Sequence, residues 1–258
     1  MNVFVLLKMV PDTVEDLEIG ADGKSLDAET LRYRTSDPDE HAVEQAILLK
    51  ERHGGTVTVA ALGSPEVEDA LFLALAKGAD RAVKIQWEAP SGGSRGAAQA
   101  FAAYLRKAAP SLPADSLVLV RSQAFDDLDG EIGPLLAESL GMPYLGVVTG
   151  VLPEGGQVRV VREFSGGLRG EFRVSMPAVL GIQSADKPPR YVPFAKVKAV
   201  QKSAAIAVEE CAATHPDAGL VVSALRKPEA TGRAQLFEGA PEEIAEQLVE
   251  VLQKNNLL

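Results

Sequence analysis

The most chemically suggestive stretch of the sequence runs from Ser116 to Pro143. It begins with a short apolar run, continues through a polar acidic loop and a Gly133-Pro134 step, and ends in a run with helical spacing of apolar residues. A parallel α/β sheet places its ligand sites in loops of this kind, at the carboxyl ends of strands. Amides at the start of a helix suit a phosphate, because they have no partner within the helix.

The acidic side chains of the same loop oppose that chemistry. Asp126, Asp127, Asp129 and Glu131 are anionic and would repel a phosphate. On the residues alone, the stretch is therefore either a ligand loop with an undefined ligand or a solvated, charge-rich surface turn.

Other kinds of site find little support in the sequence. The histidines His41, His53 and His215 are scattered with no ligand spacing, so we expect no metal site. There is no Gly-x-x-x-x-Gly-Lys-Ser/Thr phosphate loop and no Gly-x-Ser-x-Gly nucleophile turn. The sequence therefore gives no sign of a zinc site, a Walker-type phosphate loop or a serine nucleophile turn.

Composition limits the classes of partner. The 258 residues are 46% hydrophobic and 24% charged, which is typical of one large soluble domain or two small ones. A net charge of −10 argues against nucleic acid and anionic membranes as partners, and the first apolar run is too short for membrane insertion. The single cysteine fits a reducing compartment, so we expect a cytoplasmic protein.

Strands and helices alternate through the first half of the chain and must position the acidic loop. Buried strands are expected at 3–7, 56–62, 82–85 and 117–120, with helices between them. Asp37 is the expected cap of the first helix, with Pro38 in its first turn and Glu40 completing a capping box. This alternation predicts an α/β fold with a mostly parallel sheet and right-handed crossovers.

The pattern changes beyond Pro143. Four further strands are expected between 144 and 183, antiparallel at first and then returning to the sheet. Residues 187–239 show few periodic runs, and 241–258 form an amphipathic helix. We therefore predict an α/β domain over 1–186 and a C-terminal arm over 187–258 that packs on a partner subunit.

A set of short motifs resembles the beta subunit of the electron transfer flavoproteins. Each motif is weak alone, but the ordered set spans nearly the whole chain. The motifs are Lys8-Met-Val-Pro-Asp-Thr13, Gly78-Ala-Asp80, Gln123-Ala-Phe-Asp126 with Gly133-Pro134, Val161-Arg-Glu163 with Gly166-Gly167-Leu168, and Pro189-Arg-Tyr191. The resemblance implies a Rossmann-like, adenine-nucleotide-binding layer fold, an alpha-subunit partner that carries the redox FAD, and no catalytic centre in this chain.

The resemblance also implies a function and a nucleotide in this chain. Electrons would pass from flavin dehydrogenases, such as acyl-CoA dehydrogenases, through the FAD to a quinone-reducing or other acceptor oxidoreductase. This chain would bind AMP, or a second FAD if it belongs to the electron-bifurcating type. A stand-alone adenine-nucleotide-binding protein of the universal-stress type is the alternative from another class.

Particular residues are assigned by the same resemblance. The nucleotide would lie near two strand ends, a helix start and the acidic loop, although Leu6 and Leu62 are equally well explained as core residues. The positions are Leu6, Ser36, Asp37, Pro38, Asp39, Leu62, Asp126, Asp127, Leu128, Asp129, Gly130, Glu131, Ile132, Gly133, Pro134, Leu135, Leu136 and Ala137. Thr13 would lie near the flavin, and Phe194 would dock a dehydrogenase partner unless it is tucked under the arm.

The sequence departs from the family pattern around the acidic loop. Arg121 and Ser122 stand where the family usually has glycine and a basic residue, and Glu131 replaces a glutamine. A carboxylate beside a phosphate is costly unless a cation such as Arg121 offsets it.

Overall fold

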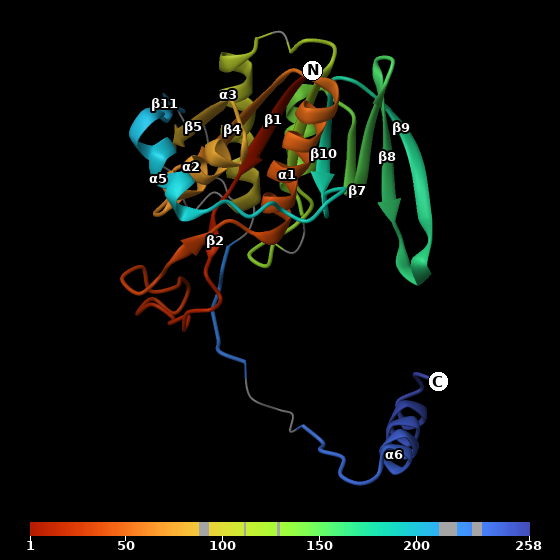
Figure 1. Ribbon diagram of the computed structural model, residues 1–258. Helices are drawn as coiled ribbons and strands as arrows, with labels where there is room; N and C mark the ends of the chain where they lie inside the picture. Colours follow the sequence, from red (N-terminus) through yellow and green to blue (C-terminus); the bar gives the residue numbers. More distant parts are fainter. Residues whose placement is uncertain (88–92, 111, 128–129, 212–220, 229–233) are drawn as a thin grey trace. The chain divides into compact units, whose positions relative to one another are not determined.

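The computed structural model describes the chain as two units, Met1–Ser223 and Ala224–Leu258. The first unit contains a sheet with its covering helices (Figure 1). In the second, the described residues form the helix α6 (Pro241–Lys254), in agreement with the amphipathic pattern. The described residues are 1–87, 93–110, 112–127, 130–211, 221–228 and 234–258.

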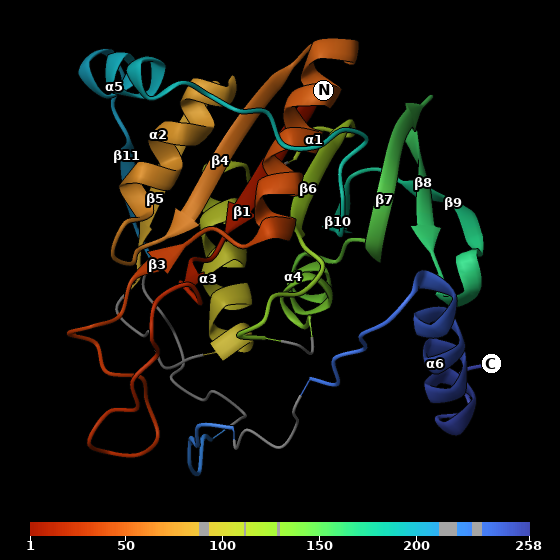
Figure 2. The same ribbon diagram turned by 60° about the horizontal axis from the view of Figure 1, so that its bottom comes forward.

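A mostly parallel sheet forms the centre of the first unit. Its strands are β1 (Asn2–Leu7), β4 (Thr56–Leu62), β5 (Arg81–Gln86), β6 (Ser116–Arg121), β7 (Tyr144–Glu154), β8 (Gln157–Glu163), β9 (Arg169–Ser175), β10 (Ala178–Ile182) and β11 (Ala207–Glu210). Among the described residues their order is β11-β5-β4-β1-β6-β10-β7-β8-β9. Only β8 pairs antiparallel with its neighbours, and β10 lies between β6 and β7 (Figure 2). The predicted α/β fold with a mostly parallel sheet is confirmed.

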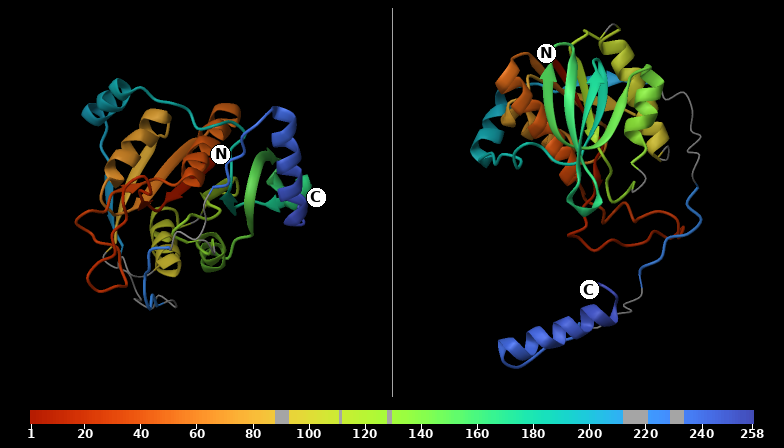
Figure 3. Two further views of the ribbon diagram at one scale, coloured as in Figure 1. Left: turned by 90° about the horizontal axis from the view of Figure 1, so that it is seen from below. Right: turned by 90° about the vertical axis from the view of Figure 1, so that its right-hand side faces the viewer.

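Helices cover both faces of the parallel part of the sheet. They are α1 (Asp37–His53), α2 (Val67–Lys77), α3 (Gly93–Ala108) and α4 (Ile132–Leu140). The orange α1 and α2 lie on one side, and the yellow-green α3 and α4 lie on the other (Figure 3). Leu7 packs in the core with α1 and α2, and the adjacent Leu6 packs in the core with α3 and α4. The run VFVLL is apolar throughout because both faces of β1 are covered.

The start of α1 corrects the predicted cap. Ser36, not Asp37, is the N-cap, since Ser36 has an extended backbone and its hydroxyl accepts a hydrogen bond from the amide of Asp39. Asp37 and Pro38 therefore lie in the first turn. Asp39, whose amide is capped by Ser36, is fully buried.

The segment after β10 is more regular than the sequence pattern indicates. Its described residues form α5 (Phe194–Ser203) and β11, which pairs with the outer strand β5. The chain reaches α5 by crossing over α1 (Figure 2), and Arg190 holds it there through ion pairs with Glu44 and Glu51. The expectation of irregular chain from 187 to 239 is therefore wrong for residues 194–210.

A two-stranded element follows β1 at the carboxyl edge of the sheet. β2 (Val10–Pro11) pairs antiparallel with β3 (Tyr33–Arg34), and residues 12–32 form the excursion between them. This element holds Thr13 and Arg34 beside the start of α1, where both line one pocket. No described helix is long and apolar enough to cross a membrane.

Candidate functional site

The carboxyl ends of β1 and β6 form the central crevice of the sheet. β1 lies between β4 and β6, and the chain leaves it toward β4 on one side before returning to β6 on the other. Loops that leave neighbouring strands in opposite directions open a crevice where α/β proteins bind ligands. Lys8 follows β1 at this point, and Arg121 is the last residue of β6.

Arg121 fills the inner part of this crevice. Its side chain is only 2% exposed, and its guanidinium lies among three carboxylates and one carbonyl. Nη2 donates to Asp127 Oδ2 at 2.6 Å and to Asp126 Oδ1 at 3.2 Å. Nη1 donates to Lys8 O at 2.7 Å and to Asp39 Oδ2 at 3.4 Å. We call Arg121, Lys8, Asp39, Asp126 and Asp127 the crevice network.

Asp39 is the deepest carboxylate of the crevice network. Its Oδ2 accepts a hydrogen bond from Ser36 Oγ at 2.8 Å, whereas its buried Oδ1 has no hydrogen-bond partner in the structure. Burial raises the pKa of Asp39 from 3.8 to about 6, although Arg121 and the Ser36 hydroxyl lower it. The carboxylate is thus held ionised at neutral pH mainly by Arg121.

The acidic loop is folded inward by the same network. Asp127 Oδ1 accepts the amide of Ala124 at 2.8 Å, which closes a tight turn. Asp126 also pairs with Lys8. The loop carboxylates at 126 and 127 therefore face two cations of the protein, and the prediction of a freely solvated acidic turn fails for these two residues.

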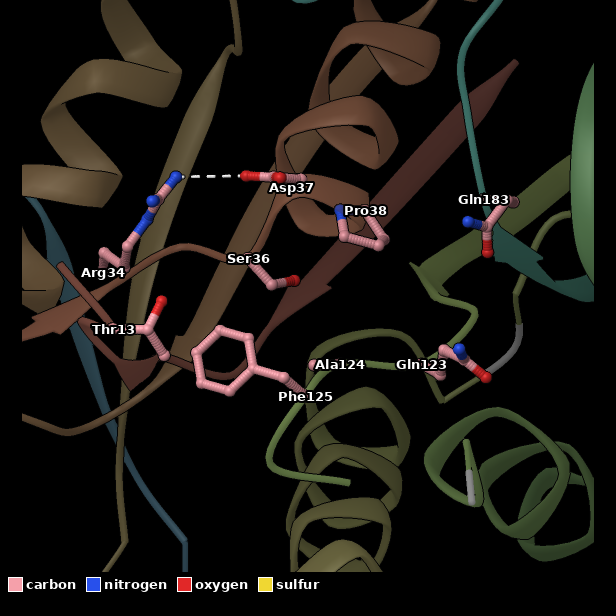
Figure 4. A pocket seen from close by; sticks show the side chains of 9 residues that line it. All are labelled: Thr13, Arg34, Ser36, Asp37, Pro38, Gln123, Ala124, Phe125 and Gln183. Carbon is pink, nitrogen blue, oxygen red and sulfur yellow. Dashed lines mark hydrogen bonds and ion pairs between the residues drawn. The ribbon is translucent and has the colours of Figure 1, made fainter. Parts of the chain in front are cut away.

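A pocket of about 320 Å³ opens beside the crevice network (Figure 4). The turn of residues 123–125 forms one wall, and the start of α1 with Thr13 and Arg34 forms the other. Arg34 pairs with Asp37 at 3.1 Å, and the ring of Phe125 lies between the two walls near Thr13. The lining residues are Thr13, Arg34, Ser36, Asp37, Pro38, Gln123, Ala124, Phe125 and Gln183. We call this the Thr13 pocket.

A larger pocket of about 510 Å³ lies on the other side of Lys8. Leu62, Tyr33 and Trp87 give it an apolar character, and Lys8 and Asp126 supply its ion pair. We call this the Trp87 pocket. Asp126, a member of the crevice network, thus lines the Trp87 pocket together with Lys8.

The start of α4 is closed by a tyrosine. A Cβ added to Gly133 would lie 2.5 Å from the ring of Tyr144. A Cβ added to Gly146 or Gly181 would come about as close to the Tyr144 hydroxyl oxygen. Gly133 thus makes room for Tyr144. Gly130 has a positive φ of 63°, and a Cβ there would meet the carbonyl oxygen of Ser122 at 2.4 Å.

The remaining residues predicted by resemblance divide between core and surface. Leu6, Ile132, Leu136 and Ala137 are buried in the core on the α3 and α4 side, and Leu135 packs against that core. Leu62 is also buried there and lines the Trp87 pocket. Glu131 and Pro134 are exposed. Leu128 and Asp129 lie outside the described residues.

Phe194 lies at the start of α5, far along the chain from these residues. Its side chain is 70% exposed, and Lys198 Nζ lies 5.2 Å from the centre of its ring. Tyr191 nearby is 86% exposed. Within the unit Met1–Ser223, Phe194 is therefore an exposed aromatic residue, and the docking role and the covered position under the arm both stay predictions.

Sequence reasoning missed the central position of Arg121. A charged residue directly after a fully apolar strand is the one local signal for it, since such a residue is either exposed or paired inside the fold. Its partners Lys8 and Asp39 are far away in the sequence, and only the fold brings them together. Gln183, whose side chain accepts from Ser122 Oγ at 2.6 Å, was missed for the same reason.

Metal chemistry has no candidate in the described residues, where no group of three or more histidine, cysteine or acidic side chains could hold a metal ion. The crevice network contains three carboxylates, but a guanidinium occupies their centre.

Comparison with known proteins gives consistent results. Residues 25–216 match the family model described as "Electron transfer flavoprotein domain". The chain is similar to the electron transfer flavoprotein subunit beta of Methylophilus methylotrophus, with 29% identity over 98% of both chains. It is also similar to the subunits of that name from Bacillus subtilis (29%, over 98% of this chain and 97% of the relative) and Thermoanaerobacterium thermosaccharolyticum (35%, over 74% and 71%).

Proposed function

The chain belongs to the electron transfer flavoprotein family, among its beta subunits, and from this premise we propose that it is one half of a heterodimer that relays electrons between flavin dehydrogenases and an acceptor oxidoreductase. The observation that carries the proposal is the similarity to beta subunits over 98% of the chain. That coverage also weighs against a stand-alone nucleotide-binding protein of the stress type. The alpha subunit holds the redox FAD in this proposal.

The role of this chain is to shape the surroundings of the partner's flavin. When bound, the flavin supplies the electron-carrying chemistry. We assign the Thr13 pocket to the flavin-facing side of the chain, because Thr13 has the position that the resemblance gives to a flavin-proximal residue. The exposed Phe125 and the exposed Gln123 offer this side one apolar and one polar contact.

Phe194 is assigned to dehydrogenase docking. Its exposed ring and the nearby exposed Tyr191 form an apolar centre, and Lys196 and Lys198 flank it with positive charge. Buried aromatic side chains supply much of the free energy of binding at interfaces, whereas rim charges mainly raise association rates. The contact between Lys198 and the Phe194 ring restricts that ring before a partner arrives.

The C-terminal arm is assigned to the alpha subunit. Helix α6 carries an apolar stripe of Ile244, Leu248, Val251 and Leu252, and its described residues include no buried side chain. An amphipathic helix with an uncovered apolar stripe is typical of a docking element. Residues 187–258 would thus combine two contacts, with a dehydrogenase near Phe194 and with the alpha subunit through α6. The single cysteine is in keeping with action in the cytoplasm.

The nucleotide implied for this chain is not part of the proposal. AMP, and equally the second FAD of a bifurcating type, needs phosphate-binding donors near the acidic loop. The cations at the strand ends are already paired with carboxylates, and Tyr144 closes the space beside Gly133. These residues do not fit a phosphate, so no electron step is assigned through a nucleotide in this chain.

Co-expression tests the proposal. The chain is produced together with its alpha subunit, and the purified complex is examined for 1:1 stoichiometry, a flavin spectrum and reduction by a flavin dehydrogenase. A yellow heterodimer that accepts electrons is expected. A chain that forms no complex with the alpha subunit, or a complex without flavin, would overturn the proposal.

A further inference from the structure

We infer that this chain has closed its own nucleotide crevice: the carboxylates of Asp39, Asp126 and Asp127 stand where a phosphate would lie opposite Arg121 and Lys8, and neither AMP nor a second FAD binds there. The inference deepens the proposed function, on which it rests for the expectation that beta subunits hold a nucleotide at this position. It concerns the ligand content of this chain and not the electron relay.

The first argument is space. The side chains of Arg121 and Asp39 are 2% and 0% exposed, so they occupy the interior of the crevice. Three distances of 2.6, 2.7 and 3.2 Å fix the guanidinium to Asp127, Lys8 O and Asp126. A nucleotide that approached the strand ends would have to displace this side chain together with the turn of residues 124–127.

The second argument is charge. Two cations, Lys8 and Arg121, face three carboxylates in the crevice network, so the network has a formal charge of −1 when all of them are ionised. Arg34, which lines the neighbouring Thr13 pocket, is paired with Asp37. A phosphate would add negative charge to a partly buried site that already holds an excess of it, and such repulsion is strong at low effective dielectric.

The third argument is the start of α4, where the amides of a helix would meet a phosphate. Ile132 and Gly133 are buried, and Tyr144 fills the space that a Cβ on Gly133 would enter. Glu131, the residue before the helix, is exposed and anionic. Two buried residues and one exposed carboxylate at the start of this helix disfavour an anion there.

The two neighbouring pockets offer no alternative phosphate site among their described lining residues. In the Thr13 pocket the cation is Arg34, which is bound to Asp37. In the Trp87 pocket it is Lys8, which is bound to Asp126. An adenine ring could enter the apolar Trp87 pocket, but its phosphate would find no unpaired donor cation there.

Quantifying the bound nucleotides tests the inference. The purified heterodimer is denatured, and the released FAD, AMP, ADP and ATP are separated by chromatography and counted per heterodimer. One FAD and no adenine nucleotide above trace level is the expected result. One AMP per heterodimer, or two FAD, would overturn the inference. A heterodimer without any flavin would overturn the proposed function instead.

A second measurement removes the uncertainty of ligand loss during purification. The melting temperature of the heterodimer is measured without AMP and with AMP at about 1 mM. Binding too weak to raise the melting temperature at this concentration would not hold a structural ligand. We expect no change for the natural chain. A saturable rise would overturn the inference, even if no nucleotide was released from the purified protein.

The double variant Asp126→Asn/Asp127→Asn tests the claim that these two carboxylates take the place of a phosphate opposite Arg121 and Lys8. It leaves Arg121 and Lys8 without those two anions while keeping an oxygen for the Ala124 amide. We expect affinity for AMP or inorganic phosphate to rise about tenfold or more, since charge-assisted hydrogen bonds become available. Asp12→Asn/Asp16→Asn, on the exposed excursion, is the matched control. No gain in the first variant would overturn the claim that the carboxylates stand in for the phosphate.

Discussion

Replacement of Arg121 by methionine tests the crevice network most directly. Methionine keeps much of the length of the side chain but removes the cation. Asp39 would then be left fully buried with Ser36 Oγ as its remaining side-chain donor. Asp126 would keep Lys8, and Asp127 would keep the amide of Ala124. The loss therefore falls mainly on Asp39.

The expected destabilisation is about 3 kcal/mol at neutral pH. Removing one partner of a buried ion pair typically costs 3–5 kcal/mol, because an uncompensated charge remains. The lower part of this range applies, since the buried Asp39 carboxylate can become neutral by taking up a proton. With Arg121 present its pKa is already about 6, and loss of the leading pKa-lowering group moves it further upward.

The loss of stability in Arg121→Met should depend on pH, in a direction that follows from the raised pKa of Asp39. A carboxyl whose folded pKa lies above its unfolded value stabilises the fold at low pH, and this contribution is lost as pH rises through the folded pKa. In the natural chain, the stabilising contribution of Asp39 is lost between about pH 4 and pH 6, because its pKa is raised from 3.8 to about 6. In Arg121→Met the pKa of Asp39 is higher still, so the same stabilising contribution is lost over a range that extends to higher pH. The difference between the two proteins should therefore be small near pH 4 and grow toward pH 8.

Urea unfolding of the heterodimer at fixed protein concentration measures this difference at several pH values. Arg159→Met is the matched control, because Arg159 also pairs with two carboxylates, Glu154 and Glu171, but at the surface. Its expected cost is much smaller than that of Arg121→Met, because solvent screens ion pairs at the surface. A cost below about 1 kcal/mol for Arg121→Met at pH 8, or a cost independent of pH, would refute the central role of Arg121.

Three further variants address the other assignments. Phe194→Ala should weaken dehydrogenase docking by about 2 kcal/mol, seen as a higher KM for the heterodimer at unchanged flavin content. Leu248→Asp/Leu252→Asp should prevent assembly with the alpha subunit in co-purification, since charges would enter the apolar stripe of α6. Gly133→Ala should lower stability by about 1–3 kcal/mol, because the new methyl group meets the Tyr144 ring. The double variant Gly133→Ala/Tyr144→Leu should recover part of this loss.

Controls separate these effects from general damage. Val208→Ala removes an exposed apolar side chain from β11 and should leave KM unchanged. Gln253→Asp adds a charge to α6 outside the apolar stripe and should allow assembly. If Phe194→Ala has the KM of the natural chain, the docking assignment fails. If Tyr144→Leu brings no recovery, the contact at Gly133 does not explain the loss.

The sequence was most informative where both faces of a strand are covered. β1, β4, β5 and β6 could be predicted because short, largely apolar runs that alternate with amphipathic helices have few other solutions. β11 could not be predicted, since Ala207–Glu210 is short, largely exposed and paired with β5, a strand from a distant part of the sequence. Its position depends on a strand far away in the chain.

The candidate site shows the same division. The resemblance placed Ser36 and Asp39 at a helix start and Asp126 and Asp127 in the acidic loop, all near one nucleotide. The fold does bring their side chains together with Arg121. The nature of that site was not predictable, because the charge on a loop says little until its partners are known. Whether these residues contact a nucleotide, and whether Phe194 contacts a dehydrogenase, remain predictions.

The position of β11 has a consequence for how the chain folds. β5 is complete at Gln86, but the strand that covers its outer edge begins at Ala207. Until the later segment has been synthesised and has crossed α1, β5 presents an unpaired edge on which another chain could add a strand. Pairings between such distant segments form slowly. The nascent subunit is therefore most prone to aggregate before β11 is in place, and docking of that short strand removes the unpaired edge of β5.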